Sequence, residues 1–290
     1  MSLPFCNRIS GIITENSVFF IKRREWQMDN LNFIPEYPVI DCHMHPYLCS
    51  DRKFDFQVPE SYSEFFSVQA AAGIKLSCGS FNERGAGLEA EKLYKCNERV
   101  LTVHREYPDS FYPGVNISPL LPEESCSEME KFHRAGFNWV GEIAWYVMGY
   151  EKYSLPGMDL ICDLAENLGM VINLHPSSLE DMDKLIGRFP KVNFVIAHPE
   201  SSWGVMPTYE LAVKHPNMYL DLSGSGLFRM GMLRKGIDML GKGRILFGTD
   251  YPICNPAMNV AGVMFEKLSG DECRAVFRDN FLNLTGYKIS

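Results

Sequence analysis

Five residues with metal-binding side chains each stand at or near the end of a short apolar run. They are His43 and His45 in PVIDCHMHP, His175 in MVINLHPSS, His198 in NFVIAHPE and Asp250 in RILFGTDYP. Imidazole nitrogens and carboxylate oxygens are the ligands that divalent zinc, manganese, iron and nickel take in proteins. The chain has seven histidines, and a random distribution would place them in helices and loops as often as at strand ends. The pattern therefore predicts one metal centre at one end of a sheet.

His43 and His45 are separated by a single residue. Because side chains two apart on a strand point the same way, the two imidazoles can bind one ion together. Cys42 and Met44 have the opposite parity, and we expect them in the core. Any one of these histidines could be an ordinary buried side chain with a hydrogen bond, but their recurrence at successive strand ends favours a metal site.

Beyond residue 36 the chain alternates short apolar runs with helical patterns. The candidate strands cover 38–43, 73–78, 111–116, 137–142, 170–175, 192–198, 218–222 and 244–249, with helical patterns such as 87–107, 124–136 and 158–169 between them. Such alternation indicates a parallel sheet. A doubly wound open sheet is the alternative, but no glycine-rich phosphate loop follows the first strand. We predict a single-domain α/β fold, a (β/α)8 TIM barrel over residues 37–290, with residues 1–36 as an N-terminal extension.

Strand parity places the candidate ligands on one face of the sheet. In 137–142, Asn138, Val140 and Glu142 share a face, and His175 and Asp250 occupy the corresponding face of their own strands, opposite the larger apolar side chains. In a barrel that face points inward, and the active site lies where the strands end.

Composition narrows the class of partner. The 290 residues are 46% hydrophobic and carry a net charge of −8, which disfavours nucleic acid because phosphate binding needs a basic face. The sequence contains no run of 18 apolar residues, so it predicts no membrane-spanning helix. Nine dispersed cysteines and the absence of a signal-peptide layout predict a cytoplasmic protein with reduced thiols.

The chain resembles the amidohydrolase superfamily of metal-dependent hydrolases, and most closely its amidohydrolase 2 group. The stretches that carry the resemblance are IDCHMHP, NERVLTVHREYPDSFYPGVNISPL, INLHPSS, FVIAHPE, HPNMYLDLSG, ILFGTDYP and RDNFLNLTGY. The resemblance implies that His43, His45 and Asp250 bind the more buried ion. It also implies that His175 and His198 either bind a second ion or divide into a ligand and a proton shuttle.

The fourth strand departs from many members of that superfamily. A lysine that bridges two ions after carbamylation often ends this strand, whereas FNWVGEIAWY has Glu142. VGEIAWY is similar to the glutamate-bearing strand of TatD-type nucleases, in which the glutamate is a ligand. We therefore expect Glu142 to bind metal, the alternative being a glutamate paired with an arginine at the strand end.

Two arrangements of the centre follow. In one, Glu142 bridges two ions; in the other, His43, His45, His175 and Asp250 surround one ion and His198 hydrogen-bonds the water or substrate. On zinc, a bound water has a pKa of about 7, and Asp250 could take its proton and pass it to a leaving group. The expected cofactor is one or two divalent ions, with zinc favoured over manganese, iron and nickel.

Residues for substrate binding carry a weaker signal. Arg84 and Arg229 follow the second and seventh strands and could clamp a carboxylate or phosphate, although each is also typical of a surface arginine. The aromatic side chains of the loops, Trp145, Tyr146 and Trp203, could line a pocket or simply pack their loops. Ser223 and Ser225 could hydrogen-bond a substrate or stabilise a turn.

These observations favour a metal-dependent hydrolase that uses an activated water to cleave an amide, lactone or other ester of a small molecule. The first alternative, which also occurs in the amidohydrolase 2 group, is a metal-dependent non-oxidative decarboxylase of an aromatic or unsaturated acid; it would need a carboxylate clamp and would argue against Glu142 as a ligand. The second alternative is a TatD-like phosphodiesterase or nuclease. Barrels of this group often associate through their helices, which leaves a homo-oligomer open.

Overall fold

The computed structural model describes residues 35–289 except 52, 200–203 and 225–228. Within these residues eight strands alternate with helices along the chain. The strands are β1 (Val39–Met44), β2 (Ile74–Gly79), β3 (Phe111–Pro113), β4 (Trp139–Ile143), β5 (Val171–Leu174), β6 (Phe194–Ile196), β7 (Met218–Asp221) and β8 (Ile245–Leu246). Each begins within two residues of the predicted strand, but several end earlier.

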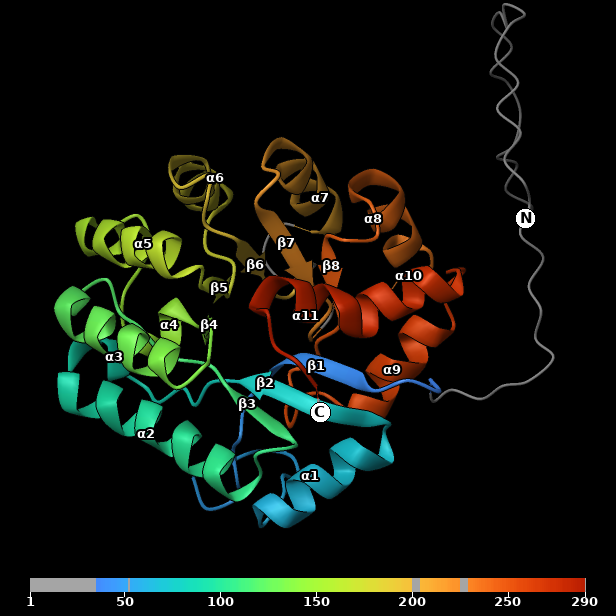
Figure 1. The fold of residues 1–290 in the computed structure, drawn as a ribbon, viewed down its shortest axis with the longest axis horizontal. Coiled ribbons are helices and arrows are strands. Elements are labelled where there is room, and N and C mark those ends of the chain that lie inside the picture. Colours follow the sequence, from blue (N-terminus) through green and yellow to red (C-terminus); the bar gives the residue numbers. More distant parts are fainter. Residues whose placement is uncertain (1–34, 52, 200–203, 225–228, 290) are drawn as a thin grey trace, which may run out of the picture. The chain divides into compact units, whose positions relative to one another are not determined.

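The helices lie outside the strands as a ring (Figure 1). They are α1 (Tyr62–Ala71), α2 (Ala90–Glu106), α3 (Pro122–Arg134), α4 (Trp145–Met148), α5 (Pro156–Leu168), α6 (Leu179–Arg188), α7 (Val205–Lys214), α8 (Met232–Leu240), α9 (Pro256–Met264), α10 (Gly270–Arg274) and α11 (Asn280–Thr285). A 3-10 turn (Ala86–Leu88) precedes α2, and a π-helical segment (Ala275–Asp279) joins α10 to α11.

Backbone hydrogen bonds close the strands into a barrel. Strands β1 to β3 form one parallel sheet and strands β4 to β8 form another, each with its strands in sequence order. At the β3–β4 seam the Val115 amide donates to the Trp139 carbonyl (3.0 Å), and the Gly141 amide donates to the Val115 carbonyl (2.8 Å). At the β8–β1 seam the Cys42 amide donates to the Phe247 carbonyl (2.9 Å). The predicted (β/α)8 barrel is confirmed, because both gaps between the sheets are bridged.

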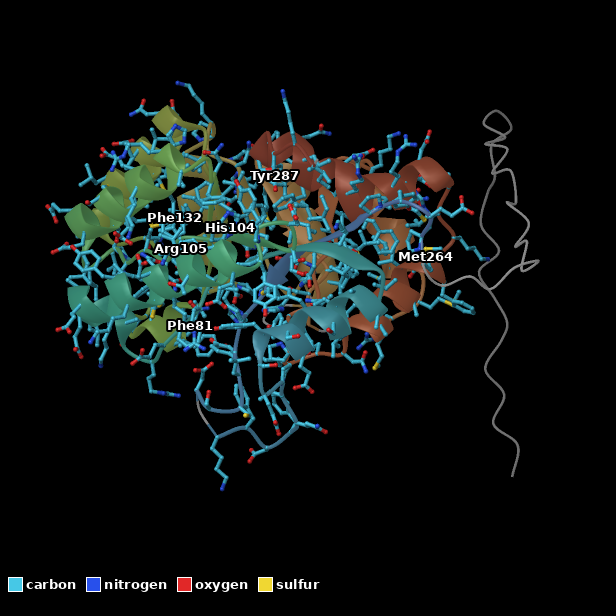
Figure 2. The ribbon with its side chains drawn as sticks, turned by 60° about the horizontal axis from the view of Figure 1, so that its bottom comes forward. Phe81, His104, Arg105, Phe132, Met264 and Tyr287 are labelled. Carbon is cyan, nitrogen blue, oxygen red and sulfur yellow. The ribbon has the colours of Figure 1, made fainter. Side chains whose placement is uncertain are left out.

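The long helix α2 shows why the sequence packs this way. Its buried side chains Leu93, Cys96, Val100 and Val103 recur three or four residues apart, which places them on one face of a helix. That face lies on the strands, while charged side chains of the opposite face, such as Arg105, are exposed to solvent (Figure 2).

An aromatic cluster joins the start of the fourth strand to the C-terminal segment. The rings of Tyr112 and Phe137 are 5.2 Å apart, and the ring of Tyr112 also lies 5.5 Å from Phe281 and 5.1 Å from Tyr287. The ring of His104, on α2, contacts Phe137 edge-on at 4.8 Å. Apolar packing therefore fills this region, and the polar side chains gather at the carboxyl ends of the strands.

Candidate metal centre

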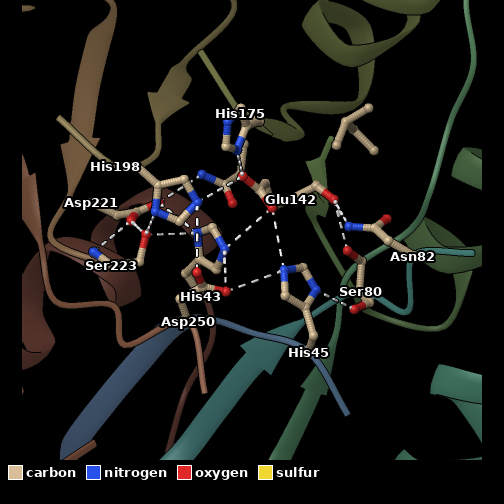
Figure 3. A network of polar contacts seen from close by, with 12 residues as sticks. His43, His45, Ser80, Asn82, Glu142, His175, His198, Asp221, Ser223 and Asp250 are labelled. Atoms are coloured by element: carbon tan, nitrogen blue, oxygen red, sulfur yellow. Dashed lines mark hydrogen bonds and ion pairs between the residues drawn. The ribbon is translucent and has the colours of Figure 1, made fainter. Parts of the chain in front are cut away.

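The side chains predicted to bind metal converge at the carboxyl ends of the strands (Figure 3). His43 lies on β1, with His45 directly after it; Glu142 is on β4, and His175 and His198 directly follow β5 and β6. The ring centroids of His43 and His198 are 4.9 Å apart, as are those of His175 and His198. The barrel thus unites residues from distant parts of the chain, and their role as ligands stays a prediction.

Glu142 occupies the middle of the cluster. Its Oε2 lies 3.4 Å from Nε2 of His43 and 3.3 Å from Nε2 of His45. Its Oε1 lies 3.0 Å from Nδ1 of His175 and 3.2 Å from Nε2 of His198. Among the residues that the structure describes, the ion pairs of Glu142 are with histidines and not with an arginine. The alternative prediction, that Glu142 pairs with an arginine at the strand end, is therefore not supported.

Asp250 faces the same histidines from the opposite side. Its Oδ1 lies 3.7 Å from Nε2 of His45 and 3.9 Å from Nε2 of His43, and its Oδ2 lies 4.0 Å from Nε2 of His198. Asp250 and His198 have backbone φ angles of 64° and 51°. Non-glycine residues seldom adopt this left-handed conformation, and such strain concentrates at functional sites.

A second layer of polar groups holds the rings from behind. Nδ1 of His43 lies 3.1 Å from Oδ2 of Asp221, and Nδ1 of His45 lies 2.8 Å from the Ser80 carbonyl. Nδ1 of His198 lies 3.1 Å from the Ser223 hydroxyl. With Nδ1 engaged in this way, Nε2 of each of these three rings is directed into the cluster.

The sequence analysis missed Asp221. This carboxylate ends β7 and is fully buried. The signal was present, because the apolar run in HPNMYLDLSG also ends on a metal-binding residue type. Applying the strand-end rule to every strand would have included it.

Burial and charge act in opposite directions on the cluster. Burial alone would raise the pKa of the Glu142 carboxyl, but the neighbouring histidines, His43 foremost, hold that pKa well below its usual range. Burial would likewise lower the pKa of His43, yet the carboxylates of Asp221 and Glu142 raise it well above its usual range. Glu142 and Asp221 are therefore both held in the ionised form, which is the form in which a carboxylate binds a cation.

The donor set fits a divalent metal. Two overlapping groups, His43 with Glu142 and His198, and His43 with His45 and Asp250, have ligand atoms within 4.8 Å of one another. Nε2 of His43 and Oδ1 of Asp250 are buried and have no hydrogen-bond partner within the described part of the chain. Buried polar atoms are normally satisfied, and a cation between these nitrogen and oxygen atoms would satisfy both.

The other histidines have local partners outside the cluster. His104 contacts the Phe111 carbonyl through Nδ1 (2.6 Å), His133 contacts Oδ1 of Asn138 (2.7 Å), and His215 contacts Asp183 (2.6 Å). These three side chains therefore play structural parts.

The residues expected to bind substrate are distributed unevenly. The ring of Tyr146, which is 52% exposed, stands edge-on to His175 with centroids 4.9 Å apart. Trp145 is half-buried, and its indole donates to the Pro176 carbonyl (3.2 Å). Ser223 is fully buried behind the histidines and bonds Asp221, so its contacts differ from the expected substrate contact.

Two of the remaining candidates lie at the surface. Arg84 and Arg229 are both exposed, on the loops after β2 and β7. Trp203 and Ser225 lie outside the described residues. Contact of any of these side chains with substrate stays a prediction.

Solved structures with the same fold include enzymes of known reaction. The chain is 15% identical to 2,6-dihydroxybenzoate decarboxylase from Rhizobium, with a TM-score of 0.69 over 86% of this chain and 98% of that one. It is 14% identical to 5-carboxyvanillate decarboxylase from Novosphingobium aromaticivorans, solved with manganese and 4-hydroxy-3-methoxy-5-nitrobenzoic acid; here the TM-score is 0.68, over 87% of this chain and 97% of that one.

A third similar structure is an uncharacterised TIM-barrel protein from Bordetella bronchiseptica. It is 19% identical, with a TM-score of 0.69 over 87% of this chain and 100% of that one. These likenesses support the barrel fold. No curated protein matches the chain.

The preference for hydrolysis over decarboxylation is wrong. Both similar enzymes of known reaction are decarboxylases, whereas the sequence analysis had placed hydrolysis first. The error has a chemical reason: the same ligands can bind the metal for either reaction, so ligand types alone do not separate them. Zinc is not confirmed either, since the 5-carboxyvanillate decarboxylase holds manganese.

Two further observations bear on class. No helix in the described residues is long and apolar enough to cross a membrane. The model of the amidohydrolase family matches residues 40–280, which include all six candidate ligands and, apart from Val39 at the start of β1, all the strands of the described residues. The chain therefore belongs to the amidohydrolase family.

Proposed function

We propose that the protein is a metal-dependent, non-oxidative decarboxylase of a small aromatic acid. The observation that carries this proposal is the buried group of histidines and carboxylates at the open end of an amidohydrolase barrel. The reaction class is supported by the decarboxylases that share the fold. The class of substrate, which the sequence left as any small molecule, is thereby narrowed to an aromatic carboxylate.

The residues that would hold the metal are His43, His45 and Asp250, with His198 beside them. Glu142, in the second overlapping group, would pair with the histidines rather than bind the ion, as expected for a decarboxylase. Manganese is the first ion to test, because a similar decarboxylase was solved with it, and zinc is the second. When bound, a divalent ion would anchor and polarise oxygen atoms of the substrate.

The chain's own residues must supply a proton. In non-oxidative decarboxylation the bond between the ring carbon and the carboxylate breaks, carbon dioxide leaves, and the ring carbon keeps the electron pair and takes a proton. Asp250, once it has taken a proton from water or from a hydroxyl of the substrate, is the group best placed to deliver it, because its Oδ1 has no hydrogen-bond partner among the described residues and borders the cluster. His198, with Nε2 4.0 Å from Asp250, would hold that carboxyl in place.

An aromatic substrate also needs an apolar wall and a charge. The exposed ring of Tyr146, beside His175, offers the wall. Arg84 and Arg229, on two loops at the carboxyl ends of the strands, are the candidate clamps for the carboxylate. A guanidinium suits this task because its paired N–H groups match the two oxygens.

The deciding experiment supplies the purified protein, loaded with manganese or zinc or stripped of metal, with several classes of substrate. These are 2,6-dihydroxybenzoate, 5-carboxyvanillate, an aromatic lactone and a phosphodiester. We expect carbon dioxide release from an aromatic acid only in the metal-loaded protein. Hydrolysis of the lactone or phosphodiester without any decarboxylation would contradict the proposal.

A further inference from the structure

We propose that Asp221, acting through Ser223, is a positioning residue that decides which ring nitrogen of His43 and of His198 carries the proton. The inference rests on the proposed metal-dependent function, since it concerns how two candidate ligands are presented. It gives a role to the buried carboxylate of Asp221, which lies behind the histidine rings.

The carboxylate of Asp221 is surrounded by hydrogen-bond donors. Its Oδ2 accepts from the Asn173 amide (2.9 Å) and lies 3.1 Å from Nδ1 of His43. Its Oδ1 accepts from the backbone amide of Ser223 (3.0 Å) and from the Ser223 hydroxyl. An ionised carboxylate can only accept, so Nδ1 of His43 donates to Asp221, and Nε2 is the nitrogen left to bind a cation.

Ser223 extends the same control to a second ring. Its hydroxyl proton is committed to Asp221, so the oxygen can only accept from the Nδ1 of His198, 3.1 Å away. In His198 too, Nε2 is therefore the nitrogen left to bind a cation. A single buried carboxylate thus sets the tautomer of two rings that come from β1 and from the end of β6 (Figure 3).

The backbone packs closely against both histidine side chains at two glycines. A Cβ at Gly224 would lie 2.7 Å from Nδ1 of His198, and a Cβ at Gly248 would lie 2.9 Å from Cβ of His43. Both separations are too short for a side chain, so only glycine allows the backbone to approach these rings. The run DLSG at 221–224 therefore provides the acid, the hydroxyl and the close approach together.

The variant Asp221→Asn tests this logic because an amide has one donor side and one acceptor side. If its NH2 faces His43, that ring must accept at Nδ1 and carry its proton on Nε2, pointing into the cluster. If its NH2 faces Ser223, the hydroxyl must turn and donate to His198, which reverses that ring instead. In either orientation one candidate ligand points an N–H at the ion.

The experiment measures metal binding without relying on turnover. Metal-free wild-type protein, Asp221→Asn and Ser223→Ala are titrated with Mn²⁺, and their Co²⁺ forms are compared by visible absorption. The matched control is Asp181→Asn, a buried carboxylate that accepts from Ser177 (2.7 Å) and from the Tyr153 amide (2.8 Å) and touches none of the cluster's rings. Thermal unfolding of each metal-free protein reports folding separately.

We expect Asp221→Asn to weaken Mn²⁺ binding by about 10- to 100-fold, the usual effect of losing such a partner, and to change the Co²⁺ spectrum. Ser223→Ala, the milder change, should alter the Co²⁺ spectrum with a smaller loss of affinity. Asp181→Asn should bind Mn²⁺ as the wild type does. The proposal is overturned if Asp221→Asn keeps both affinity and spectrum, or if Asp181→Asn loses as much. A protein that binds metal in this way but releases no carbon dioxide would refute the proposed reaction and leave this inference standing.

Discussion

The carboxylate of Asp41 accepts hydrogen bonds from both the backbone amide (3.0 Å) and the hydroxyl (2.5 Å) of Thr249. The same carboxylate accepts from the backbone amide of His43 (3.1 Å). Asp41 therefore ties the first strand to the segment after the last one, at the level where His43 and Asp250 stand. The clasp that closes the barrel also holds two candidate ligands in register.

Replacing Thr249 by valine should loosen this clasp. The change keeps the side chain's shape but removes one donor from a buried carboxylate, so we expect a loss of about 2 kcal/mol in the free energy of unfolding. Urea unfolding of the metal-free protein measures it. Thr102→Val is the control, because its exposed hydroxyl donates to the Glu98 carbonyl and accepts from Arg105, both on its own helix, and touches no buried carboxylate. Equal losses for the two variants would show that the clasp contributes nothing special.

Replacing Asp250 by asparagine should abolish turnover and leave the fold intact. The amide cannot deliver a proton, and general acid catalysis contributes about 100-fold or more to rate. The rate of carbon dioxide release tests this expectation, with far-UV circular dichroism and metal content measured on the same sample. A variant that retains metal and full activity would remove Asp250 from the mechanism.

Metal removal should lower the stability of the protein. A ligand that binds only the folded state stabilises it by about 2.7 kcal/mol at a concentration of 100 Kd. We therefore expect the unfolding temperature to fall after chelation and to recover when Mn²⁺ is restored. In His45→Asn, which lacks one candidate ligand, the recovery should be much smaller. Equal recovery in both proteins would place the ion elsewhere.

Tyr146 should contribute to substrate affinity more than to the chemical step. Removing its ring with Tyr146→Ala takes away an aromatic surface worth about 1 kcal/mol, which corresponds to roughly a fivefold rise in KM with little change in kcat. Tyr146→Phe should behave as the wild type. Tyr94→Ala is the matched control, because Tyr94 is also exposed but lies on α2. A kcat effect without a KM effect would argue against a binding wall.

Glu272 should make stability depend on acid pH. Burial raises the pKa of this carboxyl, but hydrogen bonds from Ser269 and Arg234 outweigh it and lower the pKa from 4.5 to about 2. The stabilisation is complete above pH 4.5 and is lost as the pH falls towards 2. Because Glu272 is partly exposed to solvent, we expect Glu272→Gln to cost only about 1 kcal/mol at pH 7.

Urea unfolding of wild type and Glu272→Gln between pH 7 and pH 3 measures this contribution. The difference between the two proteins should shrink steadily below pH 4.5. A difference that stays constant across that range would mean that the charge of Glu272 plays no part.

The local sequence pattern was sufficient to predict which strands form, but not to predict where each strand ends. The run RILFGTDYP predicts a strand over 244–249, whereas β8 covers only Ile245–Leu246. The chain leaves the ladder there and reaches Asp250 in a left-handed conformation (φ 64°). Apolar alternation reports burial, and burial continues past the last ladder bond, so the pattern overestimates strand length.

The sequence by itself determined the strand-and-helix alternation of the barrel and the six candidate side chains that lie near the ends of its strands, because burial periodicity and parity are properties of neighbouring residues. Tertiary structure decided what stands behind them: His43 and Asp221 are 178 residues apart, and their contact exists only once the strands close into a barrel. Likewise, the Ser223 hydroxyl lies 3.1 Å from Nδ1 of both His43 and His198 while it donates to Asp221, and only the closed barrel brings these residues together. Contacts between distant residues depend on closure and packing, and these arise from the whole chain.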